Sequence, residues 1–302
     1  MNVSDSFNSF ILSRKLADLS PKTIKAYEMF VRPFVDYLGL EKALCDVRQC
    51  DIDNYIYSVM CKPVSKSTRA TYIRHLKVFI KWCCDNYSVC FDYKSIRVPK
   101  SPKKNLKIYT TDEMRLVFSS VVLDAEWLEF RNKSIIALMY DSGLRQSEVC
   151  TLKRENISFK KSLITVLGKG NKERTVPLGN ISKEFLLIYL RICPFVNDFV
   201  FVTRYGEPLS NNAVKLMMSK LSRSLPFELS SHKLRHNFAT NYCIDSYSKR
   251  GNVDIYKLMI LLGHEDIETT RRYLHHANEI IACSECISHL DMVYFFYLKL
   301  VN

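Results

Sequence analysis

A segment rich in proline and lysine, about one third of the way along the chain, limits the folds that this sequence can adopt. It reads Ile96-Arg-Val-Pro-Lys-Ser-Pro-Lys-Lys-Asn105, with two prolines, four basic residues and no apolar periodicity. Such a composition is typical of an extended linker. Because 302 residues suffice for two domains of ordinary size, we expect a helical domain at residues 1–95, a basic linker at 96–108 and a second domain at 109–302.

The sequence before this linker predicts four helices. Ser20 is a capping residue followed by Pro21 at the first helical position, and apolar residues then recur every three or four positions as far as Gly39. This pattern is typical of one amphipathic helix with its own stop signal. We expect further helices at residues 7–16, 51–60 and 67–87.

The second domain is predicted to be mainly α-helical with a small antiparallel β-sheet. We expect helices at residues 111–118 and 131–141 and again from Ser210 onward. Between them, the alternating segments 163–167 and 173–178 are joined by a polar turn and predict a β-hairpin. Because proline has no N–H, Pro177 confines the second strand to an edge or to its end. Residues 199–203 are expected to add a short strand.

The chain carries 44 Lys and Arg against 31 Asp and Glu, a formal net charge of +13. This excess favours a polyanionic partner but does not by itself distinguish DNA from RNA or from a membrane surface. The longest apolar run, residues 292–298, has seven residues, whereas a membrane-spanning helix needs roughly 20. Residues 1–104 hold 18 basic and 10 acidic residues, so the smaller part of the chain has the larger excess.

Basic residues on helices, in a turn and in the linker are the candidates for contacts with a nucleic-acid backbone. Arg74, Lys77 and Lys81 recur at helical spacing and form a stripe that could lie along phosphates, although a solvated charged face has the same pattern. The full set of DNA-binding candidates is Lys22, Thr23, Lys25, Arg69, Arg74, Lys77, Lys81, Lys103, Lys104 and Lys172.

The eleven cysteines are scattered, and the first residues, MNVSDSFNSF, lack the basic and apolar regions of a secretion signal. We therefore expect reduced, mostly buried thiols in a cytoplasmic protein. Cys283 and Cys286, with His275, His276 and His289 nearby, leave a metal clip as the alternative. No carboxylate cluster for a magnesium pair and no Walker loop is evident, so we expect no metal and no other cofactor.

Four separated segments contain residues suited to chemistry on a phosphodiester. They are Ser142-Gly-Leu-Arg-Gln-Ser-Glu148, Gly168-Lys-Gly-Asn-Lys172, His232-Lys-Leu-Arg-His236, and Leu262-Gly-His264 followed nine residues later by Tyr273. Their order and content resemble the tyrosine recombinases, also called phage-type integrases, and most closely the Xer-like members. The resemblance covers most of the chain, since the helices before the linker are similar to the core-binding domain of that family.

This resemblance implies a fold and a set of roles. The fold is a tyrosine recombinase (DNA breaking-rejoining) catalytic core preceded by a helical, SAM-like core-binding domain. The implied catalytic residues are Arg145, Lys169, His232, Arg235, His264 and the nucleophile Tyr273. The family pattern assigns the lysine role to Lys169 rather than Lys172 and leaves His236 outside the catalytic set. It also implies that an apolar tail, at about residues 277–302, packs on a neighbouring protomer, with packing into the chain's own core as the alternative.

Elementary chemistry is consistent with these roles. Arg145 and Arg235 can hold the oxygens of a phosphodiester, because each guanidinium presents a planar fork of donors and stays charged. Glu148 lies three residues after Arg145 and can pair with an arginine to fix its orientation. His232 and Arg235 share one face of a helix and can meet one phosphate, while His236 is expected to be a packed, hydrogen-bonded histidine.

The remaining candidates donate or accept protons. Lys169, at the tip of the hairpin, could protonate a leaving oxygen, with Lys172 as its rival in the same turn. The phenol of Tyr273 needs a base such as His232 to attack at neutral pH. On an unbroken helix His264 and Tyr273 would face opposite sides. The acidic residues after His264 predict a new helix, so that Tyr273 can lie on its own element and His264 can donate to a phosphate oxygen.

The predicted function is a site-specific DNA recombinase that cleaves and rejoins strands through a 3′-phosphotyrosyl intermediate. The alternatives are a type IB topoisomerase and a non-catalytic DNA-binding regulator on the same scaffold. The expected partners are double-stranded DNA with an inverted-repeat site, further copies of the chain (a dimer on each site and a tetramer in synapsis), and an accessory protein or partner recombinase. We expect the protein in the cytoplasm, at the nucleoid when bound to DNA. Residues 239–263 are longer than the family pattern, which leaves the assembly open.

Overall fold

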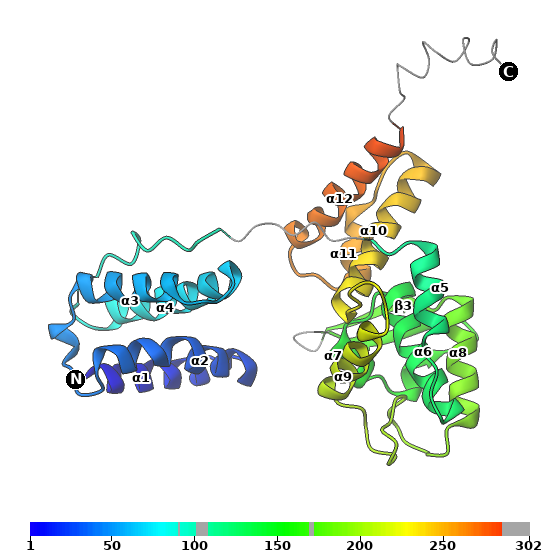
Figure 1. The fold of residues 1–302 in the computed structure, drawn as a ribbon, viewed down its shortest axis with the longest axis horizontal. Coiled ribbons are helices and arrows are strands. Elements are labelled where there is room, and N and C mark those ends of the chain that lie inside the picture. Colours follow the sequence, from blue (N-terminus) through cyan, green and yellow to red (C-terminus); the bar gives the residue numbers. More distant parts are fainter. Residues whose placement is uncertain (90, 101–107, 169–171, 286–302) are drawn as a thin grey trace, which may run out of the picture. The chain divides into compact units, whose positions relative to one another are not determined.

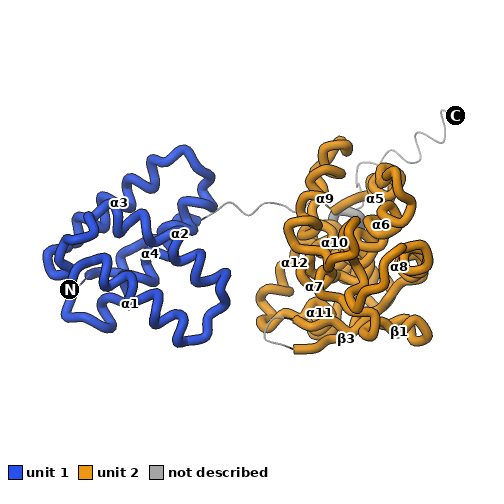
Figure 2. Tube along the Cα trace, turned by 90° about the horizontal axis from the view of Figure 1, so that it is seen from below, with its two compact units in different colours: residues 1–104 blue, residues 105–302 orange. Residues whose placement is uncertain are grey.

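The computed structural model describes residues 1–89, 91–100, 108–168 and 172–285. The chain divides into two units, residues 1–104 and residues 105–302 (Figure 2), each with its own hydrophobic core. Most of the expected linker, with Lys103 and Lys104, lies outside the described residues. Lys169 and the tail from residue 286 onward lie outside them as well.

Unit 1 contains the four helices that the sequence predicts. They are α1 (Val3–Leu16), α2 (Pro21–Leu38), α3 (Gln49–Cys61) and α4 (Lys66–Asn86), with a 3₁₀ turn, η1, at Leu44–Asp46. The Ser20 hydroxyl accepts the backbone N–H of Thr23 at the start of α2. Gly39 ends that helix with a φ of +93°, a conformation that favours glycine. Helix α1 begins earlier than expected, because the side chain of Asn2 caps it.

Aromatic side chains fill the core of unit 1. The buried ring of Phe10 lies 5.0 Å from Tyr27, 5.3 Å from Phe79 and 5.5 Å from Trp82, measured between ring centroids. These edge-to-face contacts join α1 to α2 and α4 and add to the stabilisation from burial. The opposite side of α4 is polar, and Arg74 there is exposed. Helix α4 is therefore amphipathic, with its charged face away from the core.

Unit 2 is mainly helical with one small antiparallel sheet (Figure 1). Its helices are α5 (Thr111–Ser119), α6 (Glu126–Asp141), α7 (Gln146–Cys150), α8 (Asn180–Ile192), α9 (Asn211–Arg223), α10 (Ser231–Arg250), α11 (Ile255–Leu262) and α12 (Ile267–Glu285), with a 3₁₀ turn, η2, at Arg154–Asn156. Helix α6 is buried on several sides, since residues 134–139 are all buried, and α8 and α10 pack against it. The predicted fold class is confirmed.

The sheet contains β1 (Ile157–Ser158), β2 (Leu163–Leu167) and β3 (Glu173–Pro177), in that spatial order. Strands β2 and β3 form the predicted hairpin, in which Thr165 lies opposite Thr175. Pro177 is the last residue of the edge strand β3, as its missing N–H requires. The third strand is β1, at residues for which the sequence analysis predicted no strand.

The predicted strand at residues 199–203 is wrong. This segment makes only single bridges, from Phe199 to Lys153 and from Val202 to Pro208. The Tyr189 hydroxyl on α8 donates to the Val200 carbonyl (3.0 Å) and accepts from the Val202 N–H (3.3 Å). The apolar composition of the segment therefore reflects burial against α8, a helix that the sequence analysis did not predict, rather than membership of the sheet.

Helices α10, α11 and α12 form a second, smaller cluster in unit 2. Gly263 ends α11 in the left-handed region (φ +59°), and α12 begins only at Ile267. The predicted break between His264 and Tyr273 is therefore confirmed. Ala277 and Ile281, inside the segment 277–302 that we expected to pack on a neighbouring protomer, are buried in this cluster instead. That expectation is corrected for these residues, and the rest of the tail falls largely outside the described part of the chain.

In the described ranges, no helix has both the length and the apolar character needed to cross a membrane. No three His, Cys, Asp or Glu side chains of these ranges gather where they could hold a metal ion. The possible metal clip falls on Cys286 and His289, which lie outside the described residues. The cysteines that are described are free thiols. The expectation of mostly buried thiols is wrong for three of them, which lie on exposed faces and loops of unit 1: Cys45, Cys50 and Cys61.

Candidate active site

Arg145 stands at the start of α7, where a sharp turn brings the chain out of α6. The turn contains Gly143, whose φ is +66° and where a Cβ atom would lie 2.4 Å from the ring of Phe238. Only glycine fits this turn without displacing that ring. The backbone N–H of Arg145 donates to Oε2 of Glu148 (2.7 Å), and its guanidinium donates to Oε1 (2.8 Å) and to the Gly263 carbonyl (2.8 Å). Arg145 is therefore held at both its backbone and its side chain.

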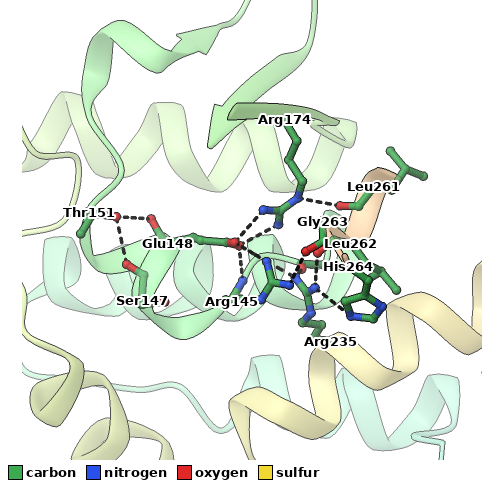
Figure 3. Close-up of polar contacts among 11 residues, drawn as sticks. Arg145, Ser147, Glu148, Thr151, Arg174, Arg235, Leu261, Leu262, Gly263 and His264 are labelled. Carbon is green, nitrogen blue, oxygen red and sulfur yellow. Dashed lines mark hydrogen bonds and ion pairs between the residues drawn. The ribbon is translucent and has the colours of Figure 1, made fainter. Parts of the chain in front are cut away.

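Glu148 is a buried carboxylate surrounded by arginines (Figure 3). Glu148 is 4% exposed, and its carboxylate accepts two hydrogen bonds from Arg174, at 2.6 and 2.7 Å. The nearest nitrogen of Arg235 lies 3.9 Å away. Burial alone would raise the pKa of Glu148, but hydrogen bonds and charge from Arg174, together with those from Arg145, lower it below its ordinary value. The carboxylate is therefore ionised at neutral pH.

Arg235, on α10, connects two segments that are distant in sequence. It is 6% exposed and donates to the carbonyl of Gly143, before α7, and to that of Leu262, at the end of α11. One of its nitrogens lies 3.5 Å from Nε2 of His264. Burial and the nearby charge of Arg145 lower its pKa to about 9. The guanidinium still carries its charge at pH 7, in a fixed plane beside Arg145.

His232 and His236 lie one turn apart on α10 and contact each other. Their Nε2 atoms are 2.6 Å apart, so one ring must donate and the other accept. Burial lowers the pKa of both rings, that of His236 to about 3. His236 is buried and hydrogen-bonded, as the sequence predicts. Both rings are therefore neutral at pH 7, and His232 can accept a proton.

Tyr273 projects from α12 toward these histidines. Its ring centroid lies 5.0 Å from that of His236 and 6.1 Å from that of His264, and the His264 ring is stacked at an interplanar angle of 17°. Nδ1 of His264 is 2.9 Å from the hydroxyl oxygen of Thr270, which fixes the ring. Burial raises the pKa of Tyr273, while the positive charges of Arg272 and Arg235 oppose that rise. A phenol in this position needs a base and adjacent cations to react, and both are present.

Two parts of the sequence match known family models. Residues 110–279 match the phage integrase family, and residues 7–88 match the phage integrase N-terminal SAM-like domain. This chain belongs to the phage integrase family. The resemblance to Xer-like tyrosine recombinases is confirmed, because the tyrosine recombinase XerD of Listeria monocytogenes is 30% identical to this chain over 270 residues, 85% of this chain and 89% of XerD.

A further relative is similar in sequence, and a solved structure is similar in fold. The tyrosine recombinase XerC of Staphylococcus carnosus is 28% identical over 268 residues, which cover 86% of this chain and 88% of XerC. The solved structure of the integrase of transposon Tn1549, in complex with a circular intermediate DNA, has 18% sequence identity and a TM-score of 0.73, covering 90% of this chain and 95% of that one. The last comparison shows a shared fold.

The candidate DNA-binding residues of this chain have different surroundings. Lys22, Lys25, Arg74 and Lys81 are exposed on α2 and α4, and Thr23 is half-buried beside the Ser20 cap. Two of the α4 candidates have partners within unit 1, since Arg69 donates to the Lys62 carbonyl (2.8 Å) and Lys77 to the Ile96 carbonyl (2.8 Å). Lys172 is exposed, with its Nζ 3.9 Å from Glu265.

Two residues of the candidate site, Arg174 and Thr270, do not follow from the sequence motifs. The burial of β3 alternates, and Arg174 lies on the inward side together with Val176. An arginine at an inward position of a strand requires a buried acceptor. The alternation of β3 could therefore have indicated that Arg174 pairs with a buried acidic residue. Nothing in the sequence around Thr270 predicts its contact with His264, because that contact depends on how the loop after α11 folds back.

Proposed function

We propose that this protein is a site-specific DNA recombinase in which Tyr273 attacks a DNA phosphodiester. The observation that carries the proposal is the position of Tyr273, whose ring contacts His236 and His264 on two other elements of the same unit. Arg235 lies beside His264, and Arg145 is tied to the same segment through Gly263. All of these residues lie in unit 2, which supports a cleavage site within that unit.

In the proposed cleavage step, the Tyr273 oxygen forms a bond to phosphorus and the bond to the 5′ oxygen of the next nucleotide breaks. His232 takes the phenolic proton, and Lys169 supplies a proton to the leaving oxygen. The product is a 3′-phosphotyrosyl link with a free 5′ hydroxyl. Attack by a 5′ hydroxyl from a second strand reverses the step and rejoins the DNA. The bond energy is conserved in the covalent link, so the reaction requires no ATP.

The two arginines stabilise the charge that develops on the non-bridging oxygens. Each guanidinium has five N–H donors, and the carbonyl bonds of Arg235 to Gly143 and Leu262 use only part of them. These bonds hold the guanidinium plane before DNA arrives, so little reorganisation is needed in the transition state. His264, held by Thr270, donates to a further phosphate oxygen.

The partners follow from the same proposal. Double-stranded DNA with an inverted-repeat site binds one protomer on each half, and two such sites come together in a tetramer. The net charge of +13 supports a polyanionic partner, and the relatives named above support recombination. The tail beyond α12 would connect neighbouring protomers, and an accessory protein or partner recombinase would activate them. We place the protein in the cytoplasm, at the nucleoid when bound to DNA.

The test is to incubate the protein with sheared DNA from its source and with nicked fragments that trap intermediates, then to isolate and sequence protein-linked ends. We expect adducts at one short inverted repeat, and none with Tyr273→Phe, which should still bind the site. Tyr242→Phe is the matched control, because Tyr242 packs on the same cluster of α10–α12 and should leave adduct formation intact.

Other outcomes would contradict the proposal in distinct ways. Adducts scattered over the DNA would favour a type IB topoisomerase. Site-specific binding without any adduct would favour a non-catalytic regulator. Unchanged cleavage by Tyr273→Phe would show that another residue is the nucleophile.

A further inference from the structure

Arg174 is a buried arginine that does not belong to the proposed catalytic set. Arg174 is 8% exposed, and its two terminal nitrogens donate hydrogen bonds to the two oxygens of Glu148 at 2.6 and 2.7 Å. Its Nε donates to the Leu261 carbonyl at 2.8 Å. This fork-to-fork pairing with a carboxylate is the strong form of an ion pair and requires the planar geometry of arginine.

These bonds connect three separate parts of the site (Figure 3). Arg174 itself lies on β3, directly after the turn that carries Lys172. Glu148 lies on α7 and holds Arg145. Leu261 lies near the end of α11, just before Gly263 and His264. A Cβ atom at Gly263 would lie 3.0 Å from Cδ of Arg174, so the aliphatic part of the arginine packs closely on this turn.

The charges of the cluster also distinguish Arg174 from the other two arginines. Within the described part of the chain, Glu148 is the one carboxylate that pairs with all three arginines, Arg145, Arg174 and Arg235. Arg174 bonds to both of its oxygens, and Arg145 donates to the same two oxygens. Three guanidiniums therefore share one carboxylate, and the cluster keeps a net charge of two positive units that the carboxylate does not neutralise. If Arg174 were absent, Glu148 would attract Arg145 and Arg235 more strongly and compete with a phosphate for them.

We infer that Arg174 is a positioning residue, which neutralises Glu148 and ties the β2–β3 hairpin to the end of α11 so that Arg145 and Arg235 remain available to DNA. This inference rests on the proposed function. Arg174 touches no reacting atom in it and acts through Glu148 and through the backbone that carries His264.

The experiment measures single-turnover formation of the covalent adduct on a nicked substrate at saturating DNA. It compares the wild type with Arg174→Lys, Arg174→Met, Glu148→Gln and the double variant of Arg174→Met with Glu148→Gln. The temperature is chosen so that every variant compared is folded, as judged by its thermal unfolding midpoint. Arg131→Lys is the matched control, because Arg131 is a partly buried arginine whose partners, Val202 and Asn132, lie outside the site.

We expect Arg174→Lys and Arg174→Met to bind the site but to form the adduct at least ten times more slowly. The double variant should be several times faster than Arg174→Met, because the neutral amide no longer competes for Arg145 and Arg235. Arg131→Lys should lower the unfolding midpoint yet keep the rate within twofold of the wild type. A residue with a merely structural role would change the midpoint and leave the rate at saturation unchanged.

Two results would overturn the inference: rates within twofold of the wild type for both Arg174 variants, or a double variant no faster than Arg174→Met. If Arg174→Met does not fold, the rate of Arg174→Lys tests the inference. Lysine keeps the positive charge and loses only the planar, two-pronged hydrogen bonding of the guanidinium. If the wild type forms no adduct, the proposed function itself is contradicted. If the wild type forms the adduct and the Arg174 variants form it equally fast, only the inference about Arg174 is contradicted.

Discussion

The two units of this protein use charged side chains in opposite ways. In unit 1, Arg74 and Lys81 lie exposed on α4, whereas in unit 2 Glu148, Arg174 and Arg235 are between 4% and 8% exposed. An exposed pair contributes about 0–1 kcal/mol to stability and is screened by salt, but breaking a buried pair costs about 3–5 kcal/mol. The exposed charges of Arg74 and Lys81 can therefore vary without loss of the fold, while Glu148, Arg174 and Arg235 are part of the fold of unit 2.

The chain allows each unit to be followed separately. It has two tryptophans, Trp82 in unit 1 and Trp127 in unit 2. In a Trp82→Phe protein, fluorescence reports on unit 2, and in a Trp127→Phe protein it reports on unit 1. These two single-tryptophan proteins allow the stability of each unit to be measured separately.

The largest expected effect on stability is that of Glu148→Ala. Removing this carboxylate leaves Arg174 and Arg235 buried without their common counter-charge, so unit 2 should lose about 3–5 kcal/mol. Urea unfolding followed by Trp127 measures the loss. Glu129→Ala is the control, because Glu129 pairs with Lys133 on α6 while remaining partly exposed, and it should cost about 1 kcal/mol or less. Equal losses for the two variants would contradict the contrast between the units.

Acid should destabilise unit 2 before unit 1. The pKa of His236 is lowered to about 3 and that of His264 to about 4, below the unfolded value of about 6.5. Because the folded state disfavours their charged forms, stability is full above about pH 6.5 and falls as the pH decreases toward the folded values. The lowered pKa of Glu148 acts in the same direction at still lower pH.

The expected loss at pH 5 is about 2 kcal/mol for one such buried histidine. Thermal unfolding at pH 7 and pH 5, followed through each tryptophan in turn, measures it. His236→Gln should reduce the pH dependence of unit 2. A parallel decline of both units would show that the buried histidines are not its cause.

A smaller effect is expected at a helix cap of unit 1. The Ser65 hydroxyl accepts the backbone N–H of Thr68 at the start of α4, and Ser65→Ala should cost unit 1 about 1 kcal/mol. Trp82 fluorescence during urea unfolding measures the change. Ser67→Ala, two residues further along the same helix, serves as the comparison. Unit 2 should unfold as in the wild type, since its core is separate.

The smallest effect on stability is expected for Arg74→Ala and Lys81→Ala, within about 0.5 kcal/mol of the wild type. If these residues contact DNA phosphates, each substitution should reduce the slope of log K against log salt concentration by about 0.9. Binding titrations at several salt concentrations test this. Glu28→Ala on α2, an acidic residue, should leave the slope unchanged or raise affinity. Unchanged slopes for both basic variants would remove Arg74 and Lys81 from the DNA contacts.

Local signals in the sequence were sufficient for most helices and for the hairpin. Ser20 with Pro21 marks the start of α2, and Pro177 marks the end of an edge strand, because capping and the missing proline N–H act within a few residues. Gly263 followed by acidic residues predicts the break before α12 for the same reason. The prediction of a strand at residues 199–203 is wrong because an apolar run fits a segment buried against a helix as well as it fits a strand.

The sequence by itself determined the order of the motifs, the ends of the main helices and the family to which they point, because these depend on neighbouring residues and on residue type. Only the tertiary structure decided that Arg174 pairs with Glu148, 26 residues earlier in the chain, and that Thr270 holds His264. The physical reason is that a buried charge takes whichever counter-charge the packing brings within reach. That choice is settled by how β3, α7 and α11 meet in three dimensions.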